Sequence, residues 1–147
     1  MSELTKNRKA FFNYEIHERF EAGISLQGTE VKSCRAKNVS LDEAYARIRD
    51  GELWLENAHI ATYEQGNRNN HDPRRNRRLL LRKSELRRLA QATQRRGFTI
   101  VPLSMYLKRG KVKVEVALCR GKRKPDKRET LRRQQQDEEA RRAMKRA

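Results

Sequence analysis

The stretch Thr99–Cys119, TIVPLSMYLKRGKVKVEVALC, decides the fold of this 147-residue chain. In Lys111–Cys119 valine or leucine recurs at every second position, which is the period of a strand with one buried face. Thr99–Leu107 predicts another strand, in which Pro102 should lie near a strand end, at an edge or at a bulge because proline cannot donate to a ladder. Arg109-Gly110 supplies the turn, so the stretch predicts an antiparallel hairpin.

A second hairpin is predicted over Ser40–Tyr63. Apolar and polar residues alternate from Ser40 onward, and Asp50-Gly51 is typical of a tight hairpin turn. The returning strand should be Leu53–Tyr63, whose nearly continuous apolar character predicts partial burial on both faces.

The N-terminal part of the chain predicts less regular structure. Met1–Lys9 is polar, and we expect it to be mobile. The aromatic enrichment from Phe11 to Ile16 predicts a strand, and Phe20–Leu26 predicts a second extended piece, with Gly23 as a bend or bulge.

Two helices are predicted inside this series of strands. Thr29 is a candidate N-cap for a short helix from Thr29 to Arg35. Leucines at helical spacing predict a longer helix from Arg82 to Arg96, which Gly97 should end. We therefore expect a mainly β fold with α-helices: an oligonucleotide-binding-type antiparallel β-barrel of about six strands with embedded helices. A ferredoxin-like sandwich is the competing architecture, and it is less favoured because only one long helix is available.

The chain should divide into a barrel domain, residues 1–119, and a basic C-terminal tail, residues 120–147. The only large apolar residues of the tail are Leu131 and Met144. Such a segment cannot bury enough surface to offset its backbone entropy. Acids and arginines within it recur at helix-supporting spacings, as in Glu138 and Arg142. We expect the tail to be flexible when free and helix-capable when a partner orders it.

The charge balance predicts a polyanionic partner. The chain carries 36 Lys and Arg against 19 Asp and Glu, a formal net charge of +17. Positive charge recurs in the loop before Leu79, in the helix after it and in the tail, and phosphate neutralisation dominates nucleic-acid affinity. A merely solvated basic surface is the plainer alternative. RNA is favoured over DNA because small barrels recognise RNA by shape, exposed bases and backbone contacts.

Several other classes lack support in the sequence. No apolar run is long enough to span a membrane, so we expect a cytoplasmic protein with Cys34 and Cys119 reduced. The histidines and cysteines show no metal-ligand spacing, and neither a metal nor a cofactor is expected. His71-Asp72 could serve a small ribonuclease, which would require RNA cleavage that His71→Ala removes. An ordinary turn is the favoured interpretation, so no catalytic residue is expected.

Motifs in chain order resemble the SmpB family, the SsrA-binding proteins. They are Phe20–Ile24 (FEAGI), Gly28–Ser33 (GTEVKS), Asn70–Pro73 (NHDP), Leu79–Leu81, Val101–Leu103 and Asp126–Arg128. The resemblance implies a non-enzymatic adaptor of trans-translation that binds the tRNA-like domain of transfer-messenger RNA (tmRNA). It also implies delivery of that RNA to stalled ribosomes, where the tail occupies the empty messenger channel beside the small-subunit decoding centre. Alanyl-tRNA synthetase and EF-Tu would be indirect partners through the RNA, and the protein would be a monomer.

The same resemblance assigns residues to two surfaces. The tmRNA-binding residues would be Glu21, Glu30, Lys32, Asn70, His71, Arg74, Arg77, Leu80 and Arg82. The ribosome-binding tail residues would be Lys122, Arg123, Lys124, Asp126, Lys127, Arg128, Arg132, Arg133, Arg141, Arg142 and Lys145. Pro125 stands where the family usually has an aromatic residue or histidine, so no ring-stacking role is carried over to it. A generic RNA-binding or ribosomal protein is the alternative within the binding class.

Overall fold

The computed structural model describes residues 2–63 and 70–122, which form nine strands and three helices. The elements are β1 (Ser2–Lys6), α1 (Arg8–Asn13), β2 (Tyr14–Ile24), α2 (Gly28–Arg35), β3 (Val39–Ser40), β4 (Tyr45–Arg49), β5 (Glu52–Glu56), β6 (His59–Ile60), β7 (Arg77–Leu80), α3 (Lys83–Thr93), β8 (Phe98–Lys108) and β9 (Lys111–Gly121).

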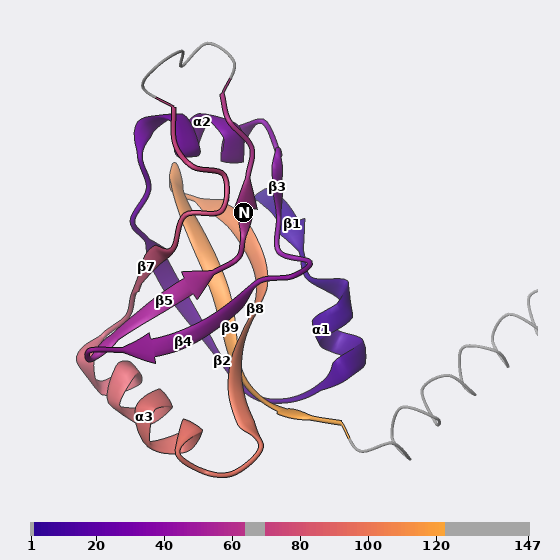
Figure 1. The fold of residues 1–147 in the computed structure, drawn as a ribbon, viewed down its shortest axis with the longest axis vertical. Helices are drawn as coiled ribbons and strands as arrows, with labels where there is room; N and C mark the ends of the chain where they lie inside the picture. The colour runs from indigo at the N-terminus through magenta and orange to yellow at the C-terminus, as the bar shows by residue number, and fades with distance from the viewer. Residues whose placement is uncertain (1, 64–69, 123–147) are drawn as a thin grey trace, which may run out of the picture.

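Six of the strands close into a ring. The order around it is β8-β4-β5-β7-β2-β9, and β9 pairs back onto β8, while β1 is added outside the ring along β8. This arrangement confirms the predicted mainly β fold of about six antiparallel strands (Figure 1). Alternate residues such as Leu55, Val114 and Val116 point inward and are fully buried, so the core fills the ring.

The hairpin of β8 and β9 is the longest pairing, running from Phe98 opposite Arg120 to Lys108 opposite Lys111. The register shifts between Pro102 and Ser104, so of the three positions expected for Pro102 the structure shows the bulge. β9 pairs on its other side with β2. The strictly alternating strand β9 therefore lies between β8 and β2 in the ring.

The hairpin of β4 and β5 is also confirmed. Its turn residues Asp50 and Gly51 both have positive φ, 52° and 76°, as a two-residue hairpin turn with matched twist requires. The returning strand is shorter than predicted. It ends at Glu56, because Asn57 adopts a φ of 61°, and the chain resumes as β6, which pairs with β3.

Two predictions for the N-terminus are wrong. The segment expected to be mobile forms β1, which pairs with β8 and buries Leu4. Phe11 belongs to α1 rather than to a strand, since Asn7 caps this helix by accepting from the backbone of Ala10. The end of that predicted strand and the extended piece predicted from Phe20 belong to one continuous strand, β2.

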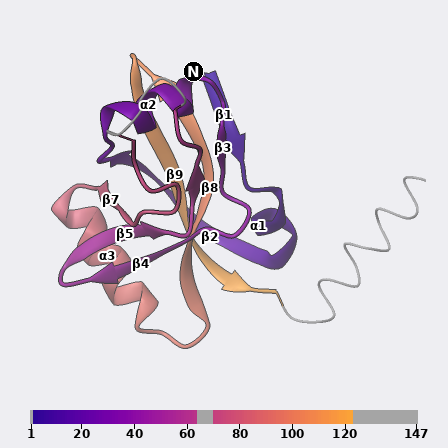
Figure 2. The same ribbon diagram turned by 45° about the horizontal axis from the view of Figure 1, so that its top comes forward.

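Helices α2 and α3 lie at opposite ends of the ring (Figures 1 and 2). The short helix is confirmed within one residue. The longer helix begins near the predicted residue but ends at Thr93, three residues early, and Gly97 follows with a φ of 88°. Leu89 of α3 is fully buried, so this helix covers one end of the core.

The boundary between barrel and tail lies later than predicted. β9 continues through Arg120 to Gly121, and the backbone of Lys122 still donates to Asn13 O at 3.0 Å. The remaining predicted tail residues lie outside the described residues. Within residues 2–63 and 70–122, no helix is long and apolar enough to cross a membrane. Both cysteines are free and buried, and burial raises the pKa of the Cys34 thiol to about 12.

Candidate RNA-binding site

The carboxylate of Glu30 organises one end of the molecule. Glu30 occupies the third position of α2 and accepts from the backbone N–H of Gln27 at 2.8 Å, which closes the first turn of the helix. The N-cap is therefore Gln27 and not the predicted Thr29. The side chain of Glu30 has no exposed surface, so it needs partners to remain charged.

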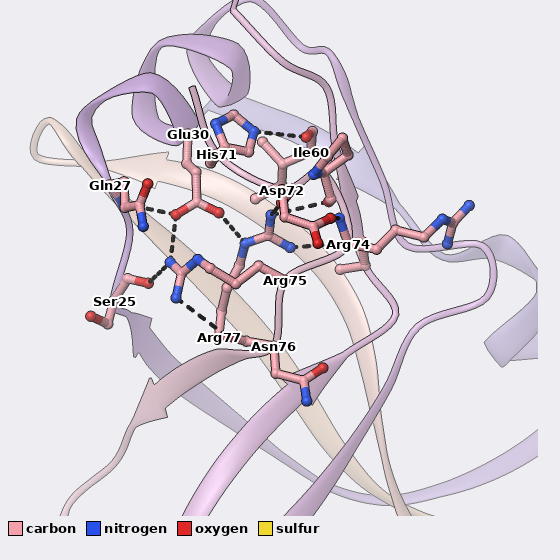
Figure 3. A network of polar contacts seen from close by, with 12 residues as sticks. Ser25, Gln27, Glu30, Ile60, His71, Asp72, Arg74, Arg75, Asn76 and Arg77 are labelled. Carbon is pink, nitrogen blue, oxygen red and sulfur yellow. Dashed lines mark hydrogen bonds and ion pairs between the residues drawn. The ribbon is translucent and has the colours of Figure 1, made fainter. Parts of the chain in front are cut away.

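Two arginines supply those partners. Arg77 and Arg75 both donate to the carboxylate of Glu30, and Figure 3 shows the two guanidinium groups converging on it. Arg77 is also fully buried and donates further to the carbonyls of Ala58 (3.0 Å) and Pro73 (3.1 Å). These contacts join α2 to β7 and to the segment that precedes β7.

The protonation of Glu30 follows from the same contacts. Burial alone would raise the pKa of this carboxyl, but hydrogen bonds from Arg75, from the Gln27 backbone and from Arg77 outweigh it. The resulting pKa lies below the ordinary value of 4.5. Glu30 is therefore an anion at neutral pH, and the network consists of charged groups.

His71 belongs to this buried end as well. Its Nε2 lies 2.9 Å from Ile60 O, and since a carbonyl can only accept, Nε2 carries the proton. Its Nδ1 lies 2.8 Å from Thr29 Oγ1, which is a hydrogen-bonding distance. Asp72 instead accepts from the backbone N–H of Arg74 at 2.9 Å, as in the ordinary turn favoured by the sequence. Both ring nitrogens of His71 are thus occupied by structural contacts.

Asn70 and Lys32 surround Tyr63 on the same side of the molecule. Oδ1 of Asn70 accepts from the backbone N–H of Tyr63 at 3.0 Å, and its Nδ2 donates to Tyr63 O. The ammonium of Lys32 lies 5.3 Å from the centroid of the Tyr63 ring. Arg74 points away from Glu30 (Figure 3) and donates to the side chain of Asn57 at 3.0 Å.

The predicted residues on β2 and β7 form an exposed surface. Gly23 of β2 lies opposite Leu80 of β7, and Leu80 is 45% exposed. Glu21 is on the same face of β2, two residues before Gly23. Its carboxylate accepts from Lys108 Nζ at 3.0 Å, and hydrogen bonds from Lys108 and Tyr106 hold its pKa below the ordinary value.

A groove of about 570 Å³ continues this surface toward α3. Apolar and basic side chains line it together, and the acidic Glu52 lies among them. The apolar residues include Leu80, Leu81 and Leu86, and the basic ones are Arg78, Lys83 and Arg87. Arg82, at the N-cap of α3, adds a further cation beside the groove. A groove of this composition can accept a base against its apolar part and phosphate against its rim.

The structure thus separates the predicted residues into two groups. Glu30, His71 and Arg77 are buried in one connected network, whereas Glu21, Leu80 and Arg82 are on the surface. Sequence reasoning missed Arg75, because nothing in the segment 74–78, RRNRR, shows which of its four arginines turn inward. It also missed that Glu30 is buried, since Gln27-x-x-Glu30 does not match the usual capping-box signal, which begins with Ser, Thr, Asp or Asn. Within the described ranges, no three His, Cys, Asp or Glu side chains could hold a metal ion.

Comparison with known proteins decides the family. The family model described as SmpB protein matches residues 4–146. The chain belongs to the SmpB family. SsrA-binding proteins from Levilactobacillus brevis and Trichormus variabilis are each 55% identical to it over 97% of this chain. The matched region spans 90% of the first protein and 92% of the second. These matches confirm the resemblance to SmpB seen in the motifs.

A solved structure of an SmpB protein supports the fold. It is described as "tmRNA-SmpB: a journey to the center of the bacterial ribosome", and the match has a TM-score of 0.69 at 52% sequence identity. It covers 88% of this chain and 94% of the SmpB chain. The ring with helices at its ends is therefore an arrangement that this chain shares with SmpB.

Proposed function

We propose that this protein is the RNA-binding adaptor of trans-translation, which binds the tRNA-like domain of tmRNA and delivers it to stalled ribosomes. The observation that carries the proposal is the match to SmpB over nearly the whole chain, including a structural neighbour described with tmRNA and the ribosome. The net charge of +17 gives a physical basis for binding a large RNA. The proposal includes action in the cytoplasm as a monomer, with alanyl-tRNA synthetase and EF-Tu as indirect partners.

The two groups of predicted residues have different roles in this proposal. Leu80, Arg82 and Glu21 lie on the surface and would touch the RNA, together with Lys32 and Arg74. Glu30, Arg77 and His71 would act as positioning residues, because their side chains are buried and already paired. They would hold α2 and the segment before β7 in the arrangement that the RNA meets.

A carboxylate on an RNA-binding face requires a reason, since it repels phosphate. We infer that Glu21 accepts from base amino groups or ribose hydroxyls, and so contributes discrimination while lysine and arginine contribute affinity. Its pKa below the ordinary value keeps it a charged acceptor at neutral pH. The contact with Lys108 is exposed, so RNA can displace it.

Replacing Glu21 with glutamine is therefore expected to weaken tmRNA binding about tenfold at every salt concentration, since one charged acceptor is lost and no cation is removed. Equilibrium binding measured over a salt titration checks this, with Glu3→Gln as a control that removes a carboxylate from β1. Unchanged tmRNA binding by the Glu21→Gln protein across the titration would exclude a recognition role.

The tail completes the proposal. Its basic residues would contact the messenger channel beside the decoding centre, and Lys122 fixes where it leaves the barrel. Lys122 Nζ donates to Phe11 O at 3.2 Å, in addition to the backbone contact with Asn13. Lys122, the first of the proposed ribosome-binding residues, is thus held against α1.

Recovery of bound RNA from cells tests the function as a whole. A tagged form of the full chain is purified, and the RNA that accompanies it is sequenced. We expect tmRNA to be enriched far above its cellular share, with ribosomal RNA beside it. Enrichment of ordinary tRNA or mixed messenger RNA in its place would favour a generic RNA-binding protein.

A further inference from the structure

Trp54, the only tryptophan of the chain, lies outside the core. It occupies the outward face of β5, between Leu53 and Leu55, which point inward and are at most 1% exposed. Neither hydrophobic cluster among the described residues includes Trp54. A large aromatic ring that is only partly buried and contributes to no core cluster is placed to contact something else.

Three arginines surround this ring. Arg47 of β4 lies directly opposite Trp54 across one strand pair, and Arg78 of β7 lies opposite it across the other. Opposed residues in antiparallel strands have Cβ atoms about 4.5–5.5 Å apart, so the side chains of both arginines start next to that of Trp54. The guanidinium carbon of Arg49 lies 5.8 Å from the centroid of the ring.

The arginines are held in place and remain accessible. Glu56, which is buried, accepts from Arg47 at 3.1 Å and lies 3.6 Å from Arg49, while Glu52 pairs with Arg78 at 3.2 Å. The arginine side chains nevertheless remain exposed: 56% for Arg47, 44% for Arg49 and 47% for Arg78. Three cations and two carboxylates leave the cluster with a net positive charge.

We propose that Trp54 with Arg47, Arg49 and Arg78, the Trp54 platform, binds single-stranded RNA by stacking an unpaired base on the indole while the arginines contact adjacent phosphates. Proteins that bind single-stranded nucleic acid without sequence preference often place an aromatic ring, flanked by cations, on the face of a barrel β-strand. RNA is favoured over an acidic protein because the +17 charge of the chain selects for a continuous polyanion.

The platform adjoins the surface assigned to tmRNA and shares Arg78 with the groove that continues this surface, but its aromatic ring, Trp54, does not line that groove. Arg78 and Leu80 are two residues apart on β7 and are both exposed, so the platform and the Leu80 surface share one side of the ring. The inference goes beyond the proposed function, because an unpaired RNA strand of any origin would satisfy it.

The single tryptophan makes the test direct. Fluorescence of the full chain is followed while a 12-nucleotide oligouridine is added, and in parallel while inorganic polyphosphate is added. Stacking of a base on Trp54 should quench its emission in a saturable way, whereas polyphosphate, which has charge but no bases, should leave the emission nearly unchanged.

Two variants of equal charge locate the contact. Arg49→Ala should raise the oligouridine concentration at half-maximal quenching by about threefold, the size of one exposed cation–aromatic contact. Arg88→Ala removes the same charge from α3, where Arg88 pairs with Glu18 at 3.1 Å, and should leave the concentration at half-maximal quenching nearly unchanged.

Variants of Trp54 itself are tested with fluorescently labelled RNA. Trp54→Leu should weaken RNA binding about tenfold, and Trp54→Tyr should preserve RNA binding.

Oligouridine that binds the chain by anisotropy while Trp54 emission stays constant would overturn the platform, as would equal quenching by polyphosphate. Equal effects of Arg49→Ala and Arg88→Ala would also contradict it. If the protein enriches tmRNA from cells but fails these tests, the proposed function stands and only the proposal of the Trp54 platform is wrong.

Discussion

Deletion of Asp126–Ala147 is expected to abolish peptide tagging on stalled ribosomes while leaving tmRNA binding largely intact. The deleted segment contains eight basic and five acidic residues, so the deletion removes only three of the seventeen net positive charges. The surface assigned to tmRNA is contained in the described barrel and is not touched. Tagging is measured in a translation reaction on a message without a stop codon, and binding is measured with the purified chain and tmRNA.

A single substitution provides the control. Lys145→Ala should tag almost as well as the parent chain, because the tail contacts would be numerous and exposed and each contributes little. If the truncated chain also failed to bind tmRNA, the tail would be an affinity arm, and the division of roles between barrel and tail would be wrong.

Replacement of Arg77 by alanine is expected to lower the free energy of unfolding by about 3 to 5 kcal/mol, because it leaves the buried carboxylate of Glu30 without one of its two arginines. That is a large share of the total stability of about 5 to 15 kcal/mol that is usual for a domain. Chemical denaturation of the two proteins at neutral pH measures the difference.

The adjacent residue is a matched control. Arg78 is on the same strand but faces outward, and its pair with Glu52 is exposed on both sides. Arg78→Ala should cost at most about 1 kcal/mol. Equal losses for the two variants would show that the buried network does not stabilise the fold.

Acid should weaken the same network. The pKa of Glu30 is lower in the folded chain than in the unfolded chain, so its contribution is fully present above the unfolded pKa and is lost as pH falls through the folded one. The stability of the parent chain should therefore fall below about pH 4.5, and in Glu30→Gln that part of the pH dependence should be absent.

Local patterns predicted much of the ring. Alternation in Lys111–Cys119 identified β9, and Asp50-Gly51 identified the turn between β4 and β5. Where the patterns failed, tertiary contacts decided. The polar segment Ser2–Lys6 has little strand signal, but it pairs along β8, which offers an open edge beside it. Phe11 and Phe12 have strand propensity, yet the cap formed by Asn7 places them in α1.

The sequence indicated some residues of the buried network but not their burial or their pairing. The family motifs pointed to Glu30, His71 and Arg77, which the structure brings together in one network. Charged side chains are normally taken to be exposed, so the sequence could not show that Glu30 and Arg77 are fully buried. Only the closing of the ring, which brings α2 against β7, determines that they pair with each other.

Discrimination between two RNAs tests the central claim most directly. The full chain is titrated at physiological salt with the isolated tRNA-like domain of tmRNA and, separately, with an ordinary tRNA of similar length. The adaptor role predicts tighter binding of the tmRNA domain by about tenfold or more, which is about 1.4 kcal/mol. Equal affinities with equal salt dependence would show a generic polyanion binder and would contradict the account.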